Sequence, residues 1–361
     1  MKKIIVKYFV LLLITFVACK NNEVNGFFPE TDIFFMLEDI EEEYLTSLKY
    51  KFEDILFAEN IIIKNNFLII GERFLNENQN PIHLISLDNL VYNRALGNFG
   101  FGPEELSDTW NLSSGLNENT FWVFSGQNKV FSEFSLNTFS NKPIKQIKQK
   151  EDLVNGYELS WSLNGTIVGR SINDNNIFVE FDSTGKKING YGMWSEVFSH
   201  KNLNSFLIES LHSGVLRSNV DKNIYVQVGV NRDFIKILDK NNETIVSING
   251  PNNRIPDFDI ISSPMYGPML SVNRKEPINY IEAYVSDNFI YVLYSGKTPE
   301  EIRLSNEHAF NIFVFDFSGD IKYFYKLDES IRSFVVDEEM KKLYGLTTND
   351  KYTLAIFNLP S

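Results

Sequence analysis

The 361-residue sequence predicts an all-β protein built from repeated antiparallel units, and three observations lead to this class. Aromatic residues make up 14% of the chain, with 31 Phe and 16 Tyr, and these types are enriched in strands. A polar turn followed by a short aromatic or β-branched run recurs six times. Each of the first five copies is followed by two further apolar runs joined by a turn that contains Asp, Asn or Gly. Six four-stranded units predict a six-bladed β-propeller, in which the sheets pack radially.

Composition excludes several classes of protein. The formal charge of −13 argues against a nucleic-acid partner, because phosphate binding needs a basic surface. A single cysteine excludes a disulfide framework and a cysteine-based zinc site. The chain is 43% hydrophobic and 22% charged, which is enough apolar material for a large folded domain.

The N-terminus is predicted to direct the chain to a membrane. Lysines at positions 2, 3 and 7 precede an apolar run over residues 8–18. This run is shorter than the ~20 residues that a membrane-spanning helix needs, and it is typical of a signal peptide. Cys19 follows Ala18 directly, and the segment FVAC resembles a bacterial lipobox, in which the Cys thiol is lipidated and becomes the first residue. The alternative is a plain signal peptide with an incidental cysteine.

These features give three segments. Residues 1–18 are predicted to be a lipoprotein signal peptide, 19–30 the lipidated Cys with a polar tether, and 31–361 the propeller domain. The partner of the acylated N-terminus would be a lipid bilayer. Lys20 stands where lipoproteins retained at the inner membrane usually carry Asp, so the resemblance implies a cell-envelope location at the outer membrane.

The repeats place the strands of the domain. The copies align at Leu68, Phe121, Ile167, Ile224, Ile290 and Leu343, with spacings of 53, 46, 57, 66 and 53 residues. The clearest following strand pairs cover 177–192, 234–250 and 312–327. The last unit ends after its third strand, so an early strand, either 31–38 or 48–54, would complete that sheet and close the ring. A seven-bladed ring, a β-sandwich or two unrelated β-domains are the alternatives.

Helical signals are few. Residues 39–48 (DIEEEYLTSL) could form a short helix with a solvated acidic face, and residues 299–305 (PEEIRLS) a single turn. Two long excursions, 252–279 and 296–310, are expected to be loops, which commonly carry binding functions on a rigid β scaffold.

One segment carries a family resemblance. Residues 97–106 (GNFGFGPEEL) resemble the glycine-rich segment that follows the first blade in six-bladed propeller lipoproteins of Gram-negative bacteria, described as TolB-like or NHL-like. The resemblance implies a fold and a cellular location, but it does not imply a particular biochemical activity. A dinucleotide fingerprint does not fit, because the glycines stand at relative positions 0, 3 and 5 instead of 0, 2 and 5. The segment is therefore interpreted as a crossover between blades.

No catalytic, cofactor-binding or metal-binding residue is predicted. The four histidines show no metal-ligand spacing, and neither a His-Glu-x-x-His nor a Gly-x-Ser-x-Gly motif occurs. His212 is expected near the innermost strand of the fourth unit, and is therefore a candidate channel residue. Trp110 and Trp161 fall near predicted blade edges, where they could stack on a sugar or peptide or could pack between blades.

The sequence thus favours a membrane-anchored binding or scaffold module for an unknown protein or glycan partner. The alternative is a propeller hydrolase or lyase that acts on a sugar or lactone, with or without a cation. Three or more carboxylate, Asn or His side chains converging in the channel would favour the enzyme. An apolar or merely hydrated channel would favour the binding module.

Overall fold

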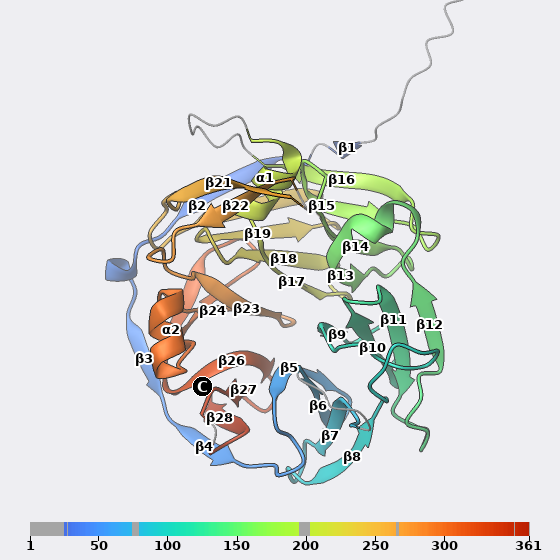
Figure 1. Cartoon of the computed structure of the whole chain (residues 1–361). Helices are drawn as coiled ribbons and strands as arrows, with labels where there is room; N and C mark the ends of the chain where they lie inside the picture. Colours follow the sequence, from blue (N-terminus) through green and yellow to red (C-terminus); the bar gives the residue numbers. More distant parts are fainter. Residues whose placement is uncertain are drawn as a thin grey trace, which may run out of the picture.

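The structure is a computed structural model that describes residues 25–26, 28–73, 79–194, 203–264, 267–349 and 351–360. Strands dominate it, and over this part of the chain they are accompanied by two short α-helices and two short 3₁₀ helices. Four-stranded antiparallel sheets stand radially around a central axis (Figure 1). The predicted class, an all-β propeller with four-stranded antiparallel blades, is confirmed.

Four units are meanders of consecutive strands. The first contains β5 (Ala58–Lys64), β6 (Phe67–Glu72), β7 (Ile82–Ser86) and β8 (Tyr92–Leu96). The second contains β9 (Asn111–Ser113), β10 (Thr120–Ser125), β11 (Val130–Ser135) and β12 (Lys145–Lys148). The third contains β13 (Gly156–Trp161), β14 (Ile167–Ser171), β15 (Asn176–Phe181) and β16 (Lys187–Met193). The fourth contains β17 (Gly214–Asn219), β18 (Ile224–Gly229), β19 (Phe234–Asp239) and β20 (Thr244–Asn249).

The remaining strands form one bent sheet. It contains β23 (Tyr280–Val285), β24 (Ile290–Tyr294), β25 (Ala309–Phe315), β26 (Ile321–Asp337), β27 (Lys342–Thr347) and β28 (Leu354–Asn358). β26 has 17 residues and serves two sets of partners. Its first half pairs with β25, and its second half pairs with β27 from Ile331 onward. The strand therefore leaves one radial sheet and enters the next.

The repeat alignment identifies corresponding strands. The aligned positions all lie in the second strand of a unit, namely β6, β10, β14, β18, β24 and β27. The strands that precede them, β5, β9, β13, β17, β23 and β26, lie around the centre of the ring (Figure 1). Apolar side chains fill the space between adjacent sheets. Leu68 of β6 and Leu346 of β27 share one such cluster, so the first and last units pack together and the ring is closed.

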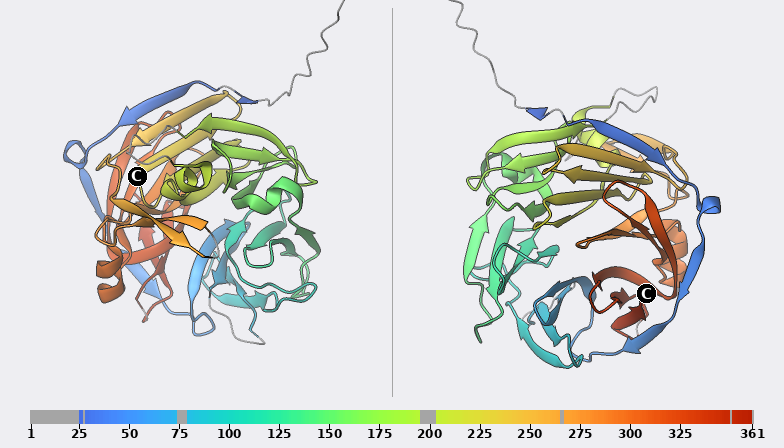
Figure 2. Two further views of the ribbon diagram at one scale, coloured as in Figure 1. Left: turned by 45° about the horizontal axis from the view of Figure 1, so that its top comes forward. Right: turned by 180° about the vertical axis from the view of Figure 1, so that it is seen from behind.

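Residues 25–26 and 28–50 form a segment that we call the N-terminal strap. It contains β1 (Asn25–Gly26), β2 (Glu30–Phe34), the 3₁₀ helix η1 (Leu37–Asp39), β3 (Glu42–Leu45) and β4 (Ser47–Tyr50). β1, β2 and β3 add parallel outer strands to β16, β20 and the first half of β26. β4 pairs antiparallel with β28. The strap thus runs along the outside of the ring past successive sheets (Figure 2).

The strap shows which early strand completes the last sheet, and it also tests the helix expected at 39–48. Of the two candidate closing strands, the later one is right, because β4 overlaps 48–54 and completes the sheet of β28. Residues 31–38 overlap β2, which lies beside β20 instead. The expected helix over 39–48 is wrong, because this segment forms β3 and β4. Pairing with β26 overrides its helical propensity: Leu45 becomes buried, and Glu42 Oε1 lies 2.7 Å from Lys326 Nζ.

A few elements lie outside the radial sheets. They are η2 (Glu151–Asn155), α1 (Ser205–Leu211), the hairpin of β21 (Phe258–Ser263) and β22 (Gly267–Val272), and α2 (Pro299–Ser305). The helix expected at 299–305 is confirmed, and it lies within the predicted excursion 296–310. The other excursion, 252–279, contains the hairpin.

The glycine-rich segment 97–106 connects β8 to β9, as predicted for a crossover. Gly97 has φ +77°, and a Cβ atom there would lie 2.9 Å from Leu106 Cδ1. Leu106 is fully buried, so the glycine allows the backbone to pack closely against this side chain.

Candidate functional site in the central channel

The innermost strands surround two adjacent chambers along the ring axis. The larger has a volume of about 420 Å³ and the smaller about 290 Å³. Both are lined in part by Asn60 of β5, Arg217 of β17 and Glu282 of β23, so these side chains stand at the boundary between them. We name the larger one the Lys64 chamber and the smaller one the Trp110 chamber, after a residue that lines each.

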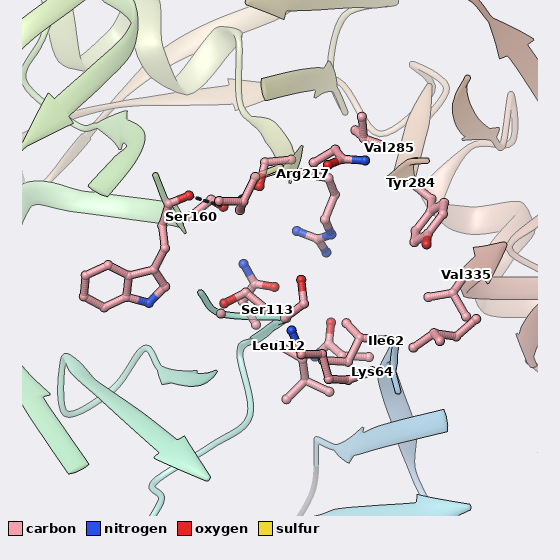
Figure 3. Close-up of a pocket in the computed structure, with 18 of the residues that line it drawn as sticks. Ile62, Lys64, Leu112, Ser113, Ser160, Arg217, Tyr284, Val285 and Val335 are labelled. Carbon is pink, nitrogen blue, oxygen red and sulfur yellow. Dashed lines mark hydrogen bonds between the residues drawn. The ribbon is translucent and has the colours of Figure 1, made fainter. Parts of the chain in front are cut away.

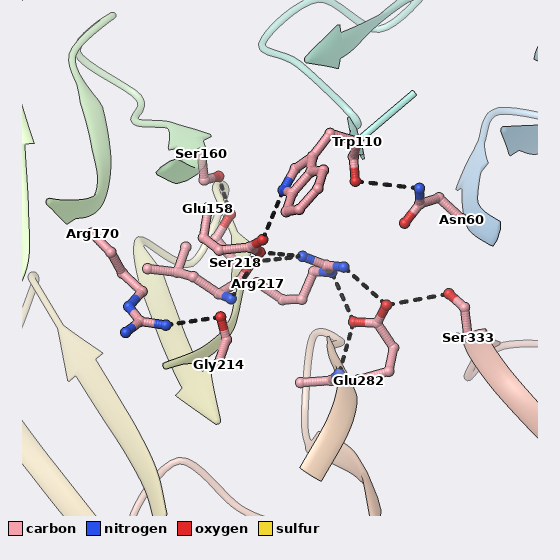
Figure 4. Close-up of polar contacts among 12 residues, drawn as sticks. Asn60, Trp110, Glu158, Ser160, Arg170, Gly214, Arg217, Ser218, Glu282 and Ser333 are labelled. Atoms are coloured by element: carbon pink, nitrogen blue, oxygen red, sulfur yellow. Dashed lines mark hydrogen bonds and ion pairs between the residues drawn. The ribbon is translucent and has the colours of Figure 1, made fainter. Parts of the chain in front are cut away.

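The boundary is built from an arginine and two carboxylates that come from three consecutive units (Figure 4). Arg217 Nε and Nη2 each lie 2.9 Å from a different carboxylate oxygen of Glu282, which gives a bidentate contact. Arg217 Nη1 lies 3.2 Å from Glu158 Oε2 on β13. The Ser333 hydroxyl donates to Glu282 at 3.2 Å, and Trp110 Nε1 donates to Glu158 at 3.1 Å. Side chains from five inner strands or their flanks therefore meet in one network.

Burial and ion pairing act in opposite directions on the pKa values of Arg217 and Glu282. Burial alone would lower the pKa of Arg217, but Glu282 and Glu158 outweigh it and raise that pKa. Burial raises the pKa of Glu282, and the guanidinium of Arg217 opposes this rise. Both carboxylates are therefore ion-paired with the same guanidinium.

The Lys64 chamber is lined mainly by short polar side chains and aliphatic groups, including Ser113, Ser160 and Val335 (Figure 3). The Ser160 hydroxyl is hydrogen-bonded to that of Ser218. Burial lowers the pKa of Lys64, although Asp221 and Glu118 act in the opposite direction. Lys64, Asp221 and Glu118 therefore add charged groups to a wall that is otherwise mainly polar and aliphatic.

The wall of the Trp110 chamber contains an aromatic ring and several charged side chains. Trp110 is 55% exposed. Glu59 lies 3.1 Å from Arg73 and 3.2 Å from Arg332, so one carboxylate bridges two guanidiniums. Burial and the nearby cations Arg332, Lys297 and Arg73 lower the pKa of His308 to about 4.
At neutral pH this histidine is therefore uncharged.

The two tryptophans identified in the sequence as candidate contacts lie in different surroundings. Trp110 lines the smaller chamber, whereas Trp161 borders the larger one but is buried. The ring centroid of Trp161 lies 4.9 Å from that of Trp122 and 5.7 Å from that of Phe131. Trp161 therefore packs between blades, which was one of the two roles considered for it. Cys19 lies outside the described residues.

His212 lines neither chamber, so the expectation of a channel contact is corrected. It caps the C-terminus of α1 and is only 1% exposed. Its ring stacks on Trp194 with centroids 4.1 Å apart. Nδ1 donates to the carbonyl of Ile208 at 2.7 Å, and Nε2 accepts from Arg232 at 2.6 Å. The helix, which the sequence reading missed, provides the Ile208 carbonyl that binds the ring.

The sequence reading also missed Glu158, Arg217 and Glu282. Each is a lone charged residue within the first strand of a repeat, in the runs YELSW, VLRSN and YIEAY. A charge at this place in consecutive repeats was the available signal, because first strands line the axis of a propeller.

Over the described ranges, no group of three or more His, Cys, Asp or Glu side chains is arranged to hold a metal ion. No helix among these residues has the length and apolar character needed to cross a bilayer.

Two solved structures have a fold similar to that of this chain. It is similar to a candidate exported protein from Bacteroides fragilis NCTC 9343, with a TM-score of 0.55, 13% identity and coverage of 92% of this chain and 100% of that one. It is also similar to a member of the DUF4221 family from Bacteroides vulgatus ATCC 8482, with a TM-score of 0.57, 11% identity and coverage of 89% and 97%. At such identities the likeness establishes the fold alone.

No curated protein matches the sequence. Residues 39–339, however, match the family described as TolB-like 6-blade propeller-like. This match covers most of the chain and confirms the resemblance noted for residues 97–106. The chain therefore belongs to the TolB-like 6-blade propeller-like family.

Proposed function

We propose that this protein is a lipid-anchored binding or scaffold module of the bacterial cell envelope, whose ligand enters the central channel. In this proposal, residues 1–18 are a signal peptide, 19–30 carry the lipidated Cys19 and the tether, and 31–361 form a six-bladed propeller. The observation that carries the proposal is the preformed pair of chambers on the ring axis, separated by a closed charge network.

The count of six follows if the bent sheet is divided at β26. Its two halves then give two four-stranded blades, the second completed by β4. Six apolar clusters among the described residues support this count, because each joins side chains from two adjacent sheets around the ring. The description of the matched family as 6-blade supports it as well.

The channel chemistry favours binding over hydrolysis or lyase activity. A hydrolase of sugars or lactones needs a carboxylate or histidine that is free to exchange a proton with the substrate. Glu158 and Glu282 are instead ion-paired with Arg217. Burial and nearby cations lower the pKa of His308 to about 4, which makes it a weak base.

Anchoring has support from the sequence and from a structural neighbour that is described as a candidate exported protein. The test is fractionation of cells that express the protein or its Cys19→Ser variant. We expect the natural protein in the membrane fraction, labelled by radioactive palmitate, and the variant unlabelled and released. An unlabelled natural protein, or a variant that stays with the membrane, would contradict the anchor.

Ligand binding is tested by affinity selection with mass spectrometry. The purified protein is incubated with a small-molecule extract of the cell envelope, and retained compounds are identified. Ser113→Trp should fill the Lys64 chamber and Trp110→Ala should alter the other, whereas Ser318→Trp changes an exposed turn and serves as the control. We expect a retained compound that one chamber variant loses and the control keeps. Retention of nothing, or equal retention by all variants, would refute a channel ligand, and conversion of the compound would favour the enzyme.

A further inference from the structure

We propose that the Trp110 chamber binds a neutral carbohydrate, with the indole of Trp110 as the stacking platform. The inference rests on the proposed binding function and names the class of ligand. It follows from three features of the chamber, namely an exposed but fixed aromatic ring, a rim of paired charged groups, and the balance of charge around them.

The first feature is the platform. Trp110 is 55% exposed, yet its indole is held from several sides. Nε1 donates to Glu158 Oε1 at 3.1 Å, and the backbone N–H donates to Asp108 Oδ1 at 3.1 Å. A Cβ atom at Gly126 would lie 3.4 Å from the indole ring, so the absence of a side chain there lets the ring rest on the backbone. A fixed aromatic face that remains open to solvent is the surface on which the C–H face of a pyranose packs.

The second feature is the polar rim. Glu59 bridges Arg73 and Arg332, and Glu158 and Glu282 flank Arg217, so carboxylates and guanidiniums alternate around the chamber. Arg332 Nε is buried and has no hydrogen-bond partner within the described residues. Adjacent hydroxyl groups of a sugar both donate and accept, and can therefore bind a carboxylate and a neighbouring guanidinium at once.

The third feature is the charge of the lining. Four carboxylates, those of Glu59, Asp108, Glu158 and Glu282, face three guanidiniums, those of Arg73, Arg217 and Arg332.
His308, with its lowered pKa, adds no positive charge near neutral pH. The chain as a whole carries a formal charge of −13. This balance disfavours uronic acids and sulfated sugars relative to neutral ones. The volume of about 290 Å³ is near the lower end of ligand pockets, which suits the end of a glycan chain.

The test uses a printed array of neutral and acidic glycans probed with the labelled full-length protein in detergent. Neutral glycans that bind are then titrated by calorimetry. We expect Trp110→Ala to weaken binding about tenfold or more, because it removes the stacking surface. Trp110→Phe should retain part of the affinity. Phe139→Ala removes an aromatic ring that is 97% exposed elsewhere, and should bind as tightly as the natural protein.

The outcomes separate this inference from the proposed function. Binding of neutral glycans that falls in Trp110→Ala while its thermal unfolding midpoint is unchanged supports the inference. Preference for acidic glycans, equal binding by Trp110→Ala, or no binding to the array overturns it. If the affinity selection nevertheless retains a compound that only Ser113→Trp loses, the channel function stands and the carbohydrate assignment fails. If neither experiment finds a ligand, both fail.

Discussion

Arg217 couples three of the innermost strands through its two carboxylate partners, and its removal would leave Glu158 and Glu282 without a counter-charge. We predict that Arg217→Met lowers the free energy of unfolding by about 3 kcal/mol at pH 8, because two partly desolvated carboxylates would then face each other. Urea unfolding followed by fluorescence measures this change. Arg303→Met, in an exposed pair on α2, is the control and should have no measurable effect.

The same variant has a predictable pH dependence. Burial already raises the pKa of Glu282, and loss of Arg217 removes the attraction that opposes this rise. A carboxyl group whose pKa is higher in the folded state costs stability as the pH rises through that pKa. The deficit of Arg217→Met should therefore shrink as the pH falls from 8 to 5. A deficit that is constant over this range would mean that the carboxylates are not the cause.

His212 should make the protein sensitive to acid. Burial and the adjacent Arg232 lower its pKa from 6.5 to about 3, so the folded state resists protonation that the unfolded state accepts. Stability contributed by the neutral ring is present above pH 6.5 and is lost as the pH falls toward 3. Between pH 8 and pH 5 this one group should remove about 2 kcal/mol.

The variant His212→Phe isolates this contribution. It changes the baseline stability at pH 8, since it loses the hydrogen bonds to Ile208 and Arg232, but it has no imidazole to protonate. We expect its unfolding free energy to fall by about 2 kcal/mol less than that of the natural protein between pH 8 and pH 5. Parallel pH curves for the two proteins would show that another group controls acid sensitivity.

For single residues, the sequence indicated one side chain of the channel wall correctly but not the position or function of the others. Trp110 was identified because an aromatic ring near a blade edge has few uses other than packing or stacking. His212 was placed near the channel from its position just before an inner strand, but side-chain direction depends on α1, which has no strong sequence signal. Glu158 and Arg217 were missed because a charge within a strand has meaning only once the strand is known to line the axis.

Among the elements, α2 depends on its caps rather than on burial. None of its residues is buried, and it begins with a capping box formed by Thr298 and Glu301, with Pro299 as its first residue. We predict that Thr298→Ala weakens the helix by about 1 kcal/mol. Amide hydrogen exchange over 301–306 should accelerate about fivefold, while the global unfolding midpoint stays unchanged.

The matched control for α2 is Leu304→Ala on the same helix. Leu304 is 70% exposed and takes no part in the cap, and alanine is a good helix former, so exchange should not accelerate. If the two variants behave alike, or if Thr298→Ala shifts the global midpoint, then α2 is stabilised by contacts with the ring rather than by its cap.

Repetition explains which elements were predictable. The second strand of every unit carries the recurrent turn and aromatic run, and all six aligned positions fall in such strands. The strap has no such repeat. Its acidic segment 39–48 has a helix-like composition, and only the outer edge of β26, supplied by residues nearly 300 positions later, makes a strand of Glu42–Leu45.

At the scale of the whole molecule, the strap turns a row of sheets into a closed body. Its first three strands cover the outer edges of β16, β20 and β26, which would otherwise expose unpaired backbone groups. Its last strand, β4, joins the beginning of the domain to the end. β12, an edge that the described part of the strap does not pair with, carries Lys145 and Lys148, and charged side chains of this kind discourage pairing with other chains.

This closure predicts that a covalent bond between β4 and β28 will form readily and will stabilise the ring. Leu48 and Ile356 are direct partners in the antiparallel pair, and such partners have Cα separations that a disulfide can span. In a Cys19→Ser background, Leu48→Cys with Ile356→Cys should oxidise spontaneously. The bond would close most of the chain into one loop and should raise the unfolding free energy by up to about 5 kcal/mol. Reduction should abolish the gain, which urea unfolding with and without dithiothreitol measures. Leu48→Cys with Ile188→Cys on β16, whose outer edge pairs with β1 instead, should stay reduced. If that control pair oxidises equally, or the first pair stays reduced, β4 does not lie beside β28 and the ring is not closed by its N-terminal strap.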